Sequence, residues 1–517
     1  MKTICAVCRF SLLLLALPWL AAAEDFTVTL VMDRGSDVGQ SFGSLFEIES
    51  EDGSMVIGAG FQNVYNTRYR GDRHSVQFYI RPTSGKREFT VQELPRPSDD
   101  LTGAYLFGRD DVVYSTYGGL KSWDSRSESW TPARGAGGTN ETMRVGNGVL
   151  VFGDSSVSYN HHEILAAPQV GRYELFFYAN GYLCFYHVHR NGKPYRIYEE
   201  GEGGFSRLYA CPWQPGQKQV NLSNAVTLRL PVVGETTFAW GQLGQQIVTG
   251  SNIGGFYIFE NDQWKMVLAP KIEESYQLYS TLGFYEHLLM GQYPTGRVFR
   301  FDRQQIRDQA DWPPVLPGVS RNAREAQTTI IYGGDLMVGV WPWGELWRYN
   351  PDSKQWIFRQ RMFDHPALSD KITHPYEFEN RENDVVNLWG QRVTSLVVNG
   401  PHLYVSTSAK APYLWKPDKF PFLAPSKWKS YGNVYQLTTP GNLAASVRWT
   451  TGPTTLAFSL KANVLAIHQD GVLLSRSAIT GKMREQLKAI RIPKNIPWGT
   501  GIYGRYGGQT IRGQVDR

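Results

Sequence analysis

The sequence predicts an all-β protein, a six- or seven-bladed β-propeller with β-rich N- and C-terminal flanks, and three observations support this prediction. A tryptophan recurs after a short aromatic strand and turn, at Trp130, Trp213, Trp264, Trp312, Trp356 and Trp428. From Trp213 the next three steps are 51, 48 and 44 residues, close to the period of a four-stranded blade. Aromatic residues form 13% of the chain and glycine occupies 52 of its 517 positions, a composition typical of strands and turns.

Residues 1–23 predict a secretory signal peptide. Lys2 and Arg9 flank the start of an apolar run, SLLLLALPWL, and three alanines precede Glu24. The apolar run is too short to span a bilayer, and no later run is long enough. We therefore expect a secreted or periplasmic protein with no transmembrane segment after signal removal.

The tryptophan repeat also sets the expected domain boundaries. Residues 24–100 are strand-rich but lack the tryptophan phrase, and we expect an accessory β segment there. The propeller is expected over 101–430, and the β-rich C-terminal segment, 431–517, could close the ring. Glycine-bounded runs of β-forming residues predict the inner strands of the blades, with the tryptophan-ended strand outside them. These runs are 111–119, 245–259, 286–301, 334–349 and 401–415.

Two gaps interrupt the period. The 83 residues from Trp130 to Trp213 leave room for two blades, of which one lacks a marker tryptophan and is expected to hold 149–164 and 173–189. The 72 residues from Trp356 to Trp428 fit one blade plus an insertion around 363–390. Counting in this way gives seven blades, with six as the alternative.

The phrase GELWRYNPDSKQW (344–356) resembles the kelch motif, in which a strand ending in Tyr-Asn/Asp-Pro leads to a turn and a tryptophan. The glycine pairs at 118–119, 254–255 and 333–334 partly match the kelch Gly-Gly. The resemblance supports a propeller and implies no chemistry, because propellers host binding proteins and enzymes alike.

The densest polar cluster lies in 160–196. A neutral imidazole near phenols and guanidinium groups could abstract a sugar C5 proton while an arginine stabilises the developing charge. This segment resembles the propeller-type polysaccharide lyases, which pair a histidine and a tyrosine as base and acid. The resemblance implies His162 as base, Tyr182 or Tyr186 as acid and Arg190 or Arg196 as carboxylate clamp, with His161 beside them as a substrate-binding candidate.

The alternative for this cluster is ordinary packing along an amphipathic strand. Period 2 places Tyr182, Cys184 and Tyr186 on one strand face, and His187 and His189 on the other. Strand periodicity alone therefore does not bring the candidate acid and the histidines to one site.

Cys184 and Cys211 remain once Cys5 and Cys8 leave with the signal peptide. An even pair in an oxidising compartment predicts a disulfide. The same two thiols with His187 and His189 have the residue types of a structural zinc site. Two free thiols are the third possibility.

Two further features point to ligands. The 363–390 insertion carries carboxylates that could hold Ca²⁺, unless it is a solvated loop: Asp364, Asp370, Glu377, Glu379, Glu382 and Asp384. Trp341 and Trp343 occupy a predicted turn at a mouth of the ring, either as a platform for sugar rings or buried between blades.

These observations rank the functions. The formal net charge of +6 is spread without a basic block, which argues against a nucleic-acid partner. We expect recognition of a polysaccharide or glycoconjugate at one mouth of the ring. The alternatives are a lyase acting on a uronate-containing glycan and a protein-interaction scaffold. The only cofactors suggested are structural zinc or calcium.

Overall fold

The fold is almost entirely β-structure, which confirms the predicted fold class. In the computed structural model, antiparallel sheets are accompanied by the short helices α1 (Pro375–Glu379) and α2 (Pro425–Trp428) and a 3-10 turn at Leu222–Asn224. Neither helix in the described part of the chain is long or apolar enough to cross a membrane. The predicted signal peptide lies outside the described residues. The structure describes residues 25–516 except 34–38, 40–42, 68–71, 85–86, 135–141, 191–203, 274, 276, 380–386, 451, 481–482, 484–485, 488–495 and 505–509.

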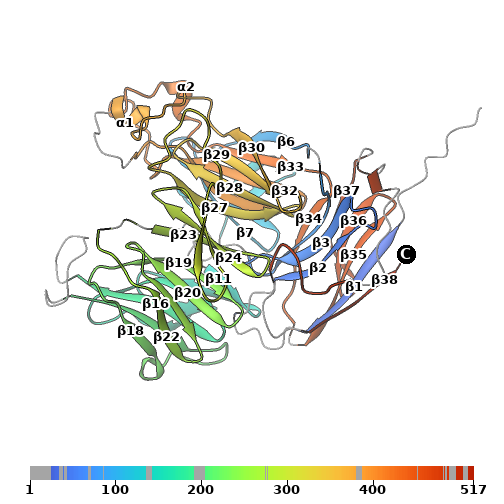
Figure 1. Cartoon of the computed structure of the whole chain (residues 1–517), viewed down its shortest axis with the longest axis horizontal. Helices are drawn as coiled ribbons and strands as arrows, with labels where there is room; N and C mark the ends of the chain where they lie inside the picture. The colour runs from blue at the N-terminus through green and yellow to red at the C-terminus, as the bar shows by residue number, and fades with distance from the viewer. Residues whose placement is uncertain are drawn as a thin grey trace, which may run out of the picture.

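Within the described residues, seven antiparallel propeller sheets follow one another along the chain, and each is named here after its first strand (Figure 1). The β7 sheet consists of β7 (Tyr105–Arg109), β8 (Val112–Thr116), β9 (Lys121–Asp124) and β10 (Ser129–Pro132). The β11 sheet consists of β11 (Thr142–Val145), β12 (Gly148–Phe152), β13 (Val157–Tyr159) and β14 (His162–Leu165). The β15 sheet consists of β15 (Arg172–Ala179), β16 (Tyr182–His189), β17 (Phe205–Pro212) and β18 (Val226–Arg229).

The remaining four propeller sheets have the same layout. Two comprise β19 (Thr237–Leu243), β20 (Gln246–Ser251), β21 (Phe256–Glu260) and β22 (Gln263–Leu268); and β23 (Gln277–Phe284), β24 (His287–Tyr293), β25 (Val298–Phe301) and β26 (Ile306–Gln309). The last two comprise β27 (Glu325–Tyr332), β28 (Asp335–Trp341), β29 (Glu345–Asn350) and β30 (Gln355–Arg361); and β31 (Arg392–Asn399), β32 (His402–Ser408) and β33 (Val434–Thr438), with β6 (Thr90–Leu94) on the outer edge.

The ring is closed by contacts between the last sheet and the first. The Leu106 amide on β7 donates to Ser395 Oγ on β31 at 3.0 Å. The outer strand of the β31 sheet is β6, which precedes the first sheet in the sequence and pairs antiparallel with β33. One sheet built from both ends of the propeller chain holds the circle shut, because opening it would break a full strand ladder.

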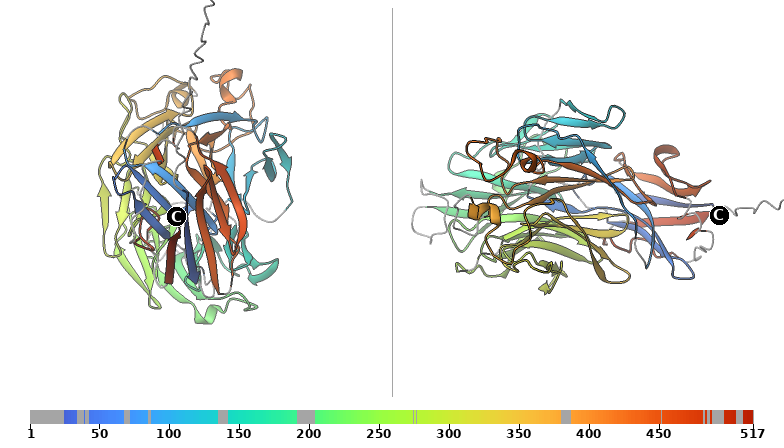
Figure 2. Two further views of the ribbon diagram at one scale, coloured as in Figure 1. Left: turned by 90° about the vertical axis from the view of Figure 1, so that its right-hand side faces the viewer. Right: turned by 90° about the horizontal axis from the view of Figure 1, so that it is seen from above.

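The two flanks form a single β-sandwich (Figures 1 and 2), which lies at one end of the elongated molecule. One sheet has the order β37-β36-β35-β1-β38 and the other has the order β2-β3-β5-β34. The first sheet consists of β1 (Phe26–Asp33), β35 (Pro453–Lys461), β36 (Val464–Gln469), β37 (Val472–Ala478) and β38 (Thr510–Asp516). The second sheet consists of β2 (Ser44–Glu49), β3 (Met55–Phe61), β5 (Ser75–Pro82) and β34 (Asn442–Ser446).

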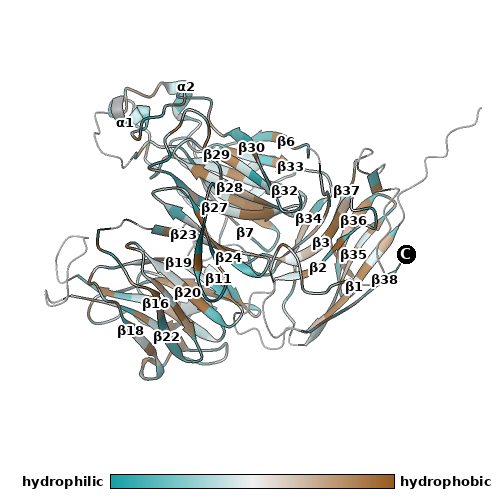
Figure 3. Cartoon of the chain, in the orientation of Figure 1, coloured by the Kyte–Doolittle hydropathy of each residue, from teal (hydrophilic) through white to brown (hydrophobic). Residues whose placement is uncertain are grey.

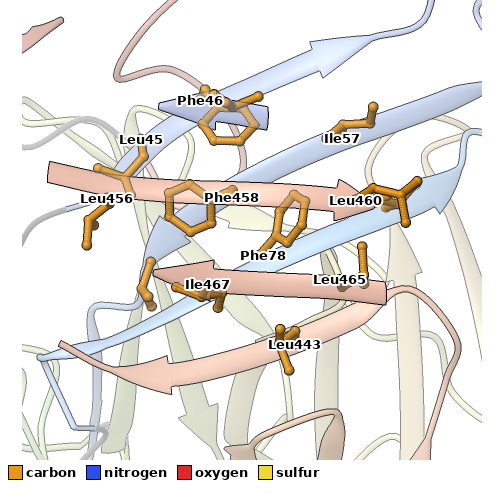
Figure 4. Close-up of a cluster of buried hydrophobic side chains, with 14 of the residues drawn as sticks. Leu45, Phe46, Ile57, Phe78, Leu443, Leu456, Phe458, Leu460, Leu465 and Ile467 are labelled. Atoms are coloured by element: carbon orange, nitrogen blue, oxygen red, sulfur yellow. The ribbon is translucent and has the colours of Figure 1, made fainter. Parts of the chain in front are cut away.

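Side chains from both sheets fill the sandwich core (Figure 4). Alternate residues of β1, such as Val28 and Leu30, are buried while those between them are partly exposed, as expected for a strand with one face in a core. Phe46 and Phe458 meet across the core at 5.6 Å between ring centroids. Figure 3 shows hydrophobic residues on the strands throughout the molecule.

A short segment of the sandwich enters the ring. Strand β4 (Val64–Asn66) pairs with the inner edge of β23. Gln62 exchanges hydrogen bonds of 2.9 Å with the backbone of Ile331. Asn63 Nδ2 donates to the Gln242 carbonyl at 2.8 Å, and Asn66 Nδ2 donates to the Gln327 carbonyl at 2.7 Å. Residues 62–67, called here the central segment, therefore join the first strands of three neighbouring propeller sheets.

The marker tryptophans follow the predicted pattern in half of the repeat. Trp130, Trp264 and Trp356 lie on the outermost strands β10, β22 and β30, which confirms the prediction for those sheets. Trp213 follows the third strand of its sheet, and Trp428 lies in α2, so the prediction is wrong for these two.

The stretches 149–164 and 173–189 were expected in one blade but lie in two sheets, the β11 sheet and the β15 sheet. The two stretches together are too long for the four strands of one sheet. Each stretch supplies at least two full strands, and each pairs with further strands of its own sheet.

Candidate functional site

The residues implied by the lyase resemblance are divided between sheets. His161 and His162 lie at the exposed β13–β14 turn of the β11 sheet. Tyr182 and Tyr186 lie on β16, one sheet further along the chain. Arg190 Nη1 is 4.0 Å from Glu174 Oε1, and Arg196 lies outside the described residues.

Tyr186 is held deep between two sheets. Its hydroxyl donates to the Glu235 carbonyl and lies 3.0 Å from Ser206 Oγ. Burial raises the pKa of Tyr186 well above its usual value. Burial, and then the hydrogen bond from Tyr182 to Asp262, raise the pKa of Tyr182 to about 12. Both phenols are engaged with protein acceptors on the β19 sheet, whereas the candidate base His162 is exposed to solvent at the edge of another sheet. The structure does not bring base and acid together.

The cysteine pair is separated by the β-sheet itself. Cys211 lies directly opposite Leu183 in the β16–β17 ladder, and Cys184 lies opposite Ala210. Because directly opposite residues point to the same face, the two sulfurs lie on different faces. Each is buried in a different hydrophobic cluster, and both are free thiols.

The same geometry separates the four candidate zinc ligands. His187 and His189 share a strand face with Leu183, and therefore with Cys211, but not with Cys184. His187 Nε2 lies 2.8 Å from the Val170 carbonyl. Burial raises the pKa of the Cys211 thiol to about 12.

Trp341 and Trp343 are buried, with 2% and 1% of their surface exposed. Trp343 packs against His374 with ring centroids 4.8 Å apart, and the Lys410 ammonium lies 4.7 Å from the Trp341 ring centroid. Neither ring offers a free face to a sugar. Burial was the alternative from the sequence; His374 of the insertion packs against Trp343, and Lys410 covers Trp341.

Buried polar side chains hold the 363–390 insertion to the segment around α2 through hydrogen bonds. His365 Nδ1 lies 2.6 Å from Tyr376 Oη, and its Nε2 lies 2.8 Å from Ser430 Oγ, near α2. Glu377 is buried and accepts the Trp389 amide, while the Asp364 carboxylate is exposed. The side chain of Asp370 is exposed, that of Glu379 is not described, and Glu382 and Asp384 lie outside the described residues. Among described side chains, no group of three suits a metal ion.

An apolar groove opens elsewhere, between the β19 and β23 sheets, and we call it the edge groove. A register shift in the β21–β22 ladder places Leu268 opposite Phe256, on the face that meets the β23 sheet. Leu268 is 44% exposed, and Ile272 beyond it is 47% exposed. The groove has a volume of about 470 Å³ and is lined mainly by Ile253, Phe256, Leu268, Leu278, Phe299 and Ile306.

The edge groove also carries charged groups. Lys271 and Asp308 are its charged lining residues, and Asp308 is paired with Arg297. The apolar side chains of the lining thus offer contact to an apolar ligand, with these charged groups beside them. This site was not predicted from the sequence, because its residues are apolar side chains of the kind that occurs on any buried strand. The one available signal in the sequence is a pair of apolar residues, Met266 and Leu268, that follows the tryptophan phrase ending at Trp264.

No protein-family model and no curated protein matches the chain. Among solved structures, the chain is similar to the computationally designed Ika8 protein, with 10% identity, coverage of 79% of this chain and 99% of the other, and a TM-score of 0.36.

Two further similar structures are β-propeller domains. The WD40 domain of Doa1 shows 10% identity over 68% of this chain and 94% of its own, with a TM-score of 0.33. The Cps50 (Swd1) domain of Myceliophteria thermophila shows 12% identity over 63% and 99%, with a TM-score of 0.34. At these scores the likenesses carry no functional argument, and the propeller assignment rests on the strand order and ring closure of this chain.

Proposed function

We propose that this protein is an exported, non-catalytic interaction scaffold that captures an extended apolar segment of another protein at the edge groove. The observation that carries the proposal is the groove itself, an open cavity lined by apolar side chains, of which Leu268 is 44% exposed. Exposed apolar surface beside a cavity is typical of protein-binding sites. The outermost strand β22 borders the groove, so a partner strand can lie along it.

The rest of the propeller supports binding outside the ring over chemistry within it. The central segment occupies the inner side of three sheets through hydrogen bonds from Gln62, Asn63 and Asn66. His162 is remote from the buried Tyr186 hydroxyl, and the two tryptophans expected to stack on sugars are covered. Glycan recognition and lyase activity therefore have less support than a protein partner.

Export is proposed from residues 1–23 alone. We expect the mature protein recovered from the cell envelope or medium to begin at Glu24, measured by intact mass and N-terminal sequencing. Recovery of an uncleaved chain in the cytoplasm would contradict export without affecting the edge groove.

A displayed random-peptide library provides the test of the groove. Panning on the mature protein should enrich peptides with apolar residues at alternate positions, because such a strand presents one apolar face. Leu268→Asp should weaken the enriched peptides at least tenfold in fluorescence anisotropy titrations. Val472→Asp is the matched control, since Val472 is 64% exposed on the distant sandwich, and it should leave binding unchanged.

Three outcomes would contradict the scaffold proposal. Peptides without apolar enrichment, or equal loss in both variants, would remove the groove as the binding site. Specific binding on an array of acidic glycans, with no peptide bound, would favour glycan recognition. New ultraviolet absorbance from an unsaturated uronate product, lost in His162→Ala, would establish a lyase.

A further inference from the structure

A second cavity lies where the sandwich meets the β31 sheet, and we call it the junction cavity. Its volume is about 590 Å³, within the range of small-molecule sites, and junctions between structural units are common places for such sites. The sandwich contributes Pro82, Ala478 and Met483, and the propeller contributes Pro401 and Thr438. The connecting segments 87–90 and 439–442 complete the wall.

Two polar side chains in this wall converge on one turn. Asn442 is 1% exposed, and its Oδ1 accepts the Gly333 amide at 3.1 Å. Its Nδ2 is buried and has no hydrogen-bond partner among the residues that the structure describes. Arg87 is 5% exposed, and its Nη1 donates to the Gly333 carbonyl at 2.6 Å. Because both side chains bond to Gly333, the Asn442 amide and the Arg87 guanidinium lie at the same end of the cavity.

The Gly333–Gly334 turn permits this approach. Both residues have positive φ, +58° and +78°. A Cβ at Gly333 would lie 2.9 Å from the Arg87 guanidinium, and one at Gly334 would lie 2.5 Å from the Tyr79 ring. The glycine pair that partly matches the kelch motif therefore serves here to seat the propeller against the sandwich.

The charge around this end of the cavity is positive. Asp335 is fully buried and accepts from Arg87 Nη1 at 2.8 Å and from Arg348 Nε at 2.7 Å. Arg359 packs on Phe89, a lining residue, at 4.3 Å from the ring centroid. Two guanidinium groups thus share one buried carboxylate, and a third lies against Phe89. Glu88 also borders the cavity, but its side chain is exposed, so solvent screens its charge.

A buried amide donor without a partner beside a cationic guanidinium suits an anion. Arg87 Nη2 makes a long contact of 3.5 Å with the Pro440 carbonyl, so this donor is weakly bonded while Nη1 fixes the guanidinium. Two adjacent N–H donors match the two oxygens of a carboxylate. Apolar side chains, Phe89 and Met483 among them, line the remainder.

We propose that the junction cavity binds a small organic acid, with its carboxylate held by Arg87 and Asn442 and its apolar body against Phe89 and Met483. This site is separate from the edge groove, and the proposal stands or fails independently of the scaffold function.

Calorimetric titration of the mature protein with benzoate tests the proposal. Benzoate should bind with one-to-one stoichiometry, and benzamide, its neutral isostere, should bind at least tenfold more weakly. Inorganic phosphate should also bind more weakly than benzoate, because it lacks an apolar body. Equal affinity for benzoate and benzamide, or phosphate binding as tightly as benzoate, would overturn the assignment.

Two variants locate the site. Asn442→Asp keeps the oxygen that accepts the Gly333 amide but replaces the Nδ2 donor by a carboxylate oxygen, so benzoate binding should fall at least tenfold. Ala478→Trp places a large ring at the exposed edge of the cavity and should block binding while leaving the buried polar groups untouched. Val472→Trp, at the other end of the same strand, is the control and should bind as wild type.

The benzoate test does not depend on the folding of any single variant. Circular dichroism and the melting temperature establish folding for each protein. If Asn442→Asp does not fold, Ala478→Trp alone decides, because its side chain lies outside the core. Unchanged benzoate affinity in folded Ala478→Trp would overturn the proposal.

Discussion

Asp335→Asn should lower the free energy of unfolding by about 3–5 kcal/mol, the typical effect of breaking a buried ion pair. The substitution preserves shape but removes the only carboxylate between Arg87 and Arg348, whose side chains are buried with it. Two guanidinium groups would then face each other without a counter-charge. Urea denaturation followed by fluorescence measures the effect, with the slope of the transition showing whether unfolding stays cooperative.

The matched control is Asp311→Asn. Asp311 pairs with Arg321 at 3.1 Å, but both side chains are largely exposed, so no measurable loss is expected. A double variant, Asp335→Asn with Arg348→Met, should recover part of the loss, because it removes one of the two uncompensated charges. If Asp335→Asn and Asp311→Asn behaved alike, the buried network would not hold the sandwich to the propeller.

The sequence predicts the propeller sheets in which the tryptophan phrase recurs. Trp264 and Trp356 each lie at the start of an outer strand, directly after a tight turn, and that pattern depends only on neighbouring residues. Ring closure by β6 could not be predicted in the same way. Its pairing with β33 joins Leu94 to Val434, and nothing local in either strand specifies so distant a partner.

The candidate sites were harder to predict because they depend on which strand faces meet when the sheets form and pack. Period 2 correctly separates Tyr186 from His187, but it does not reveal that Cys184 and Cys211 lie on opposite faces of one sheet. That outcome depends on a register offset of a single residue. Arg87 and Asn442 have no signal at all in the sequence, since 355 positions separate two side chains that meet at one glycine turn.

The acid stability of the protein should depend strongly on His374. Burial lowers the pKa of His374 to about 3, with smaller contributions from the charges of Arg361 and His365. In the unfolded chain the imidazole takes up a proton near pH 6.5, but in the folded protein it stays neutral. Stability is therefore fully present above pH 6.5 and is lost as the pH falls toward 3. Between pH 7 and pH 5 the loss from this residue should be about 2 kcal/mol.

His374→Phe isolates this effect. It retains a ring against Trp343 and removes the titration, so its free energy of unfolding should fall less than that of wild type between pH 7 and pH 5. Trp343→Phe is the control, because it weakens the same packing without a titrating group and should lower stability equally at both pH values. Glu235 and Glu345, whose pKa burial raises, act in the opposite direction, and all three proteins retain them. An unchanged pH dependence in His374→Phe would show that the insertion opens before the imidazole is protonated, since only an opened insertion gives His374 its unfolded pKa.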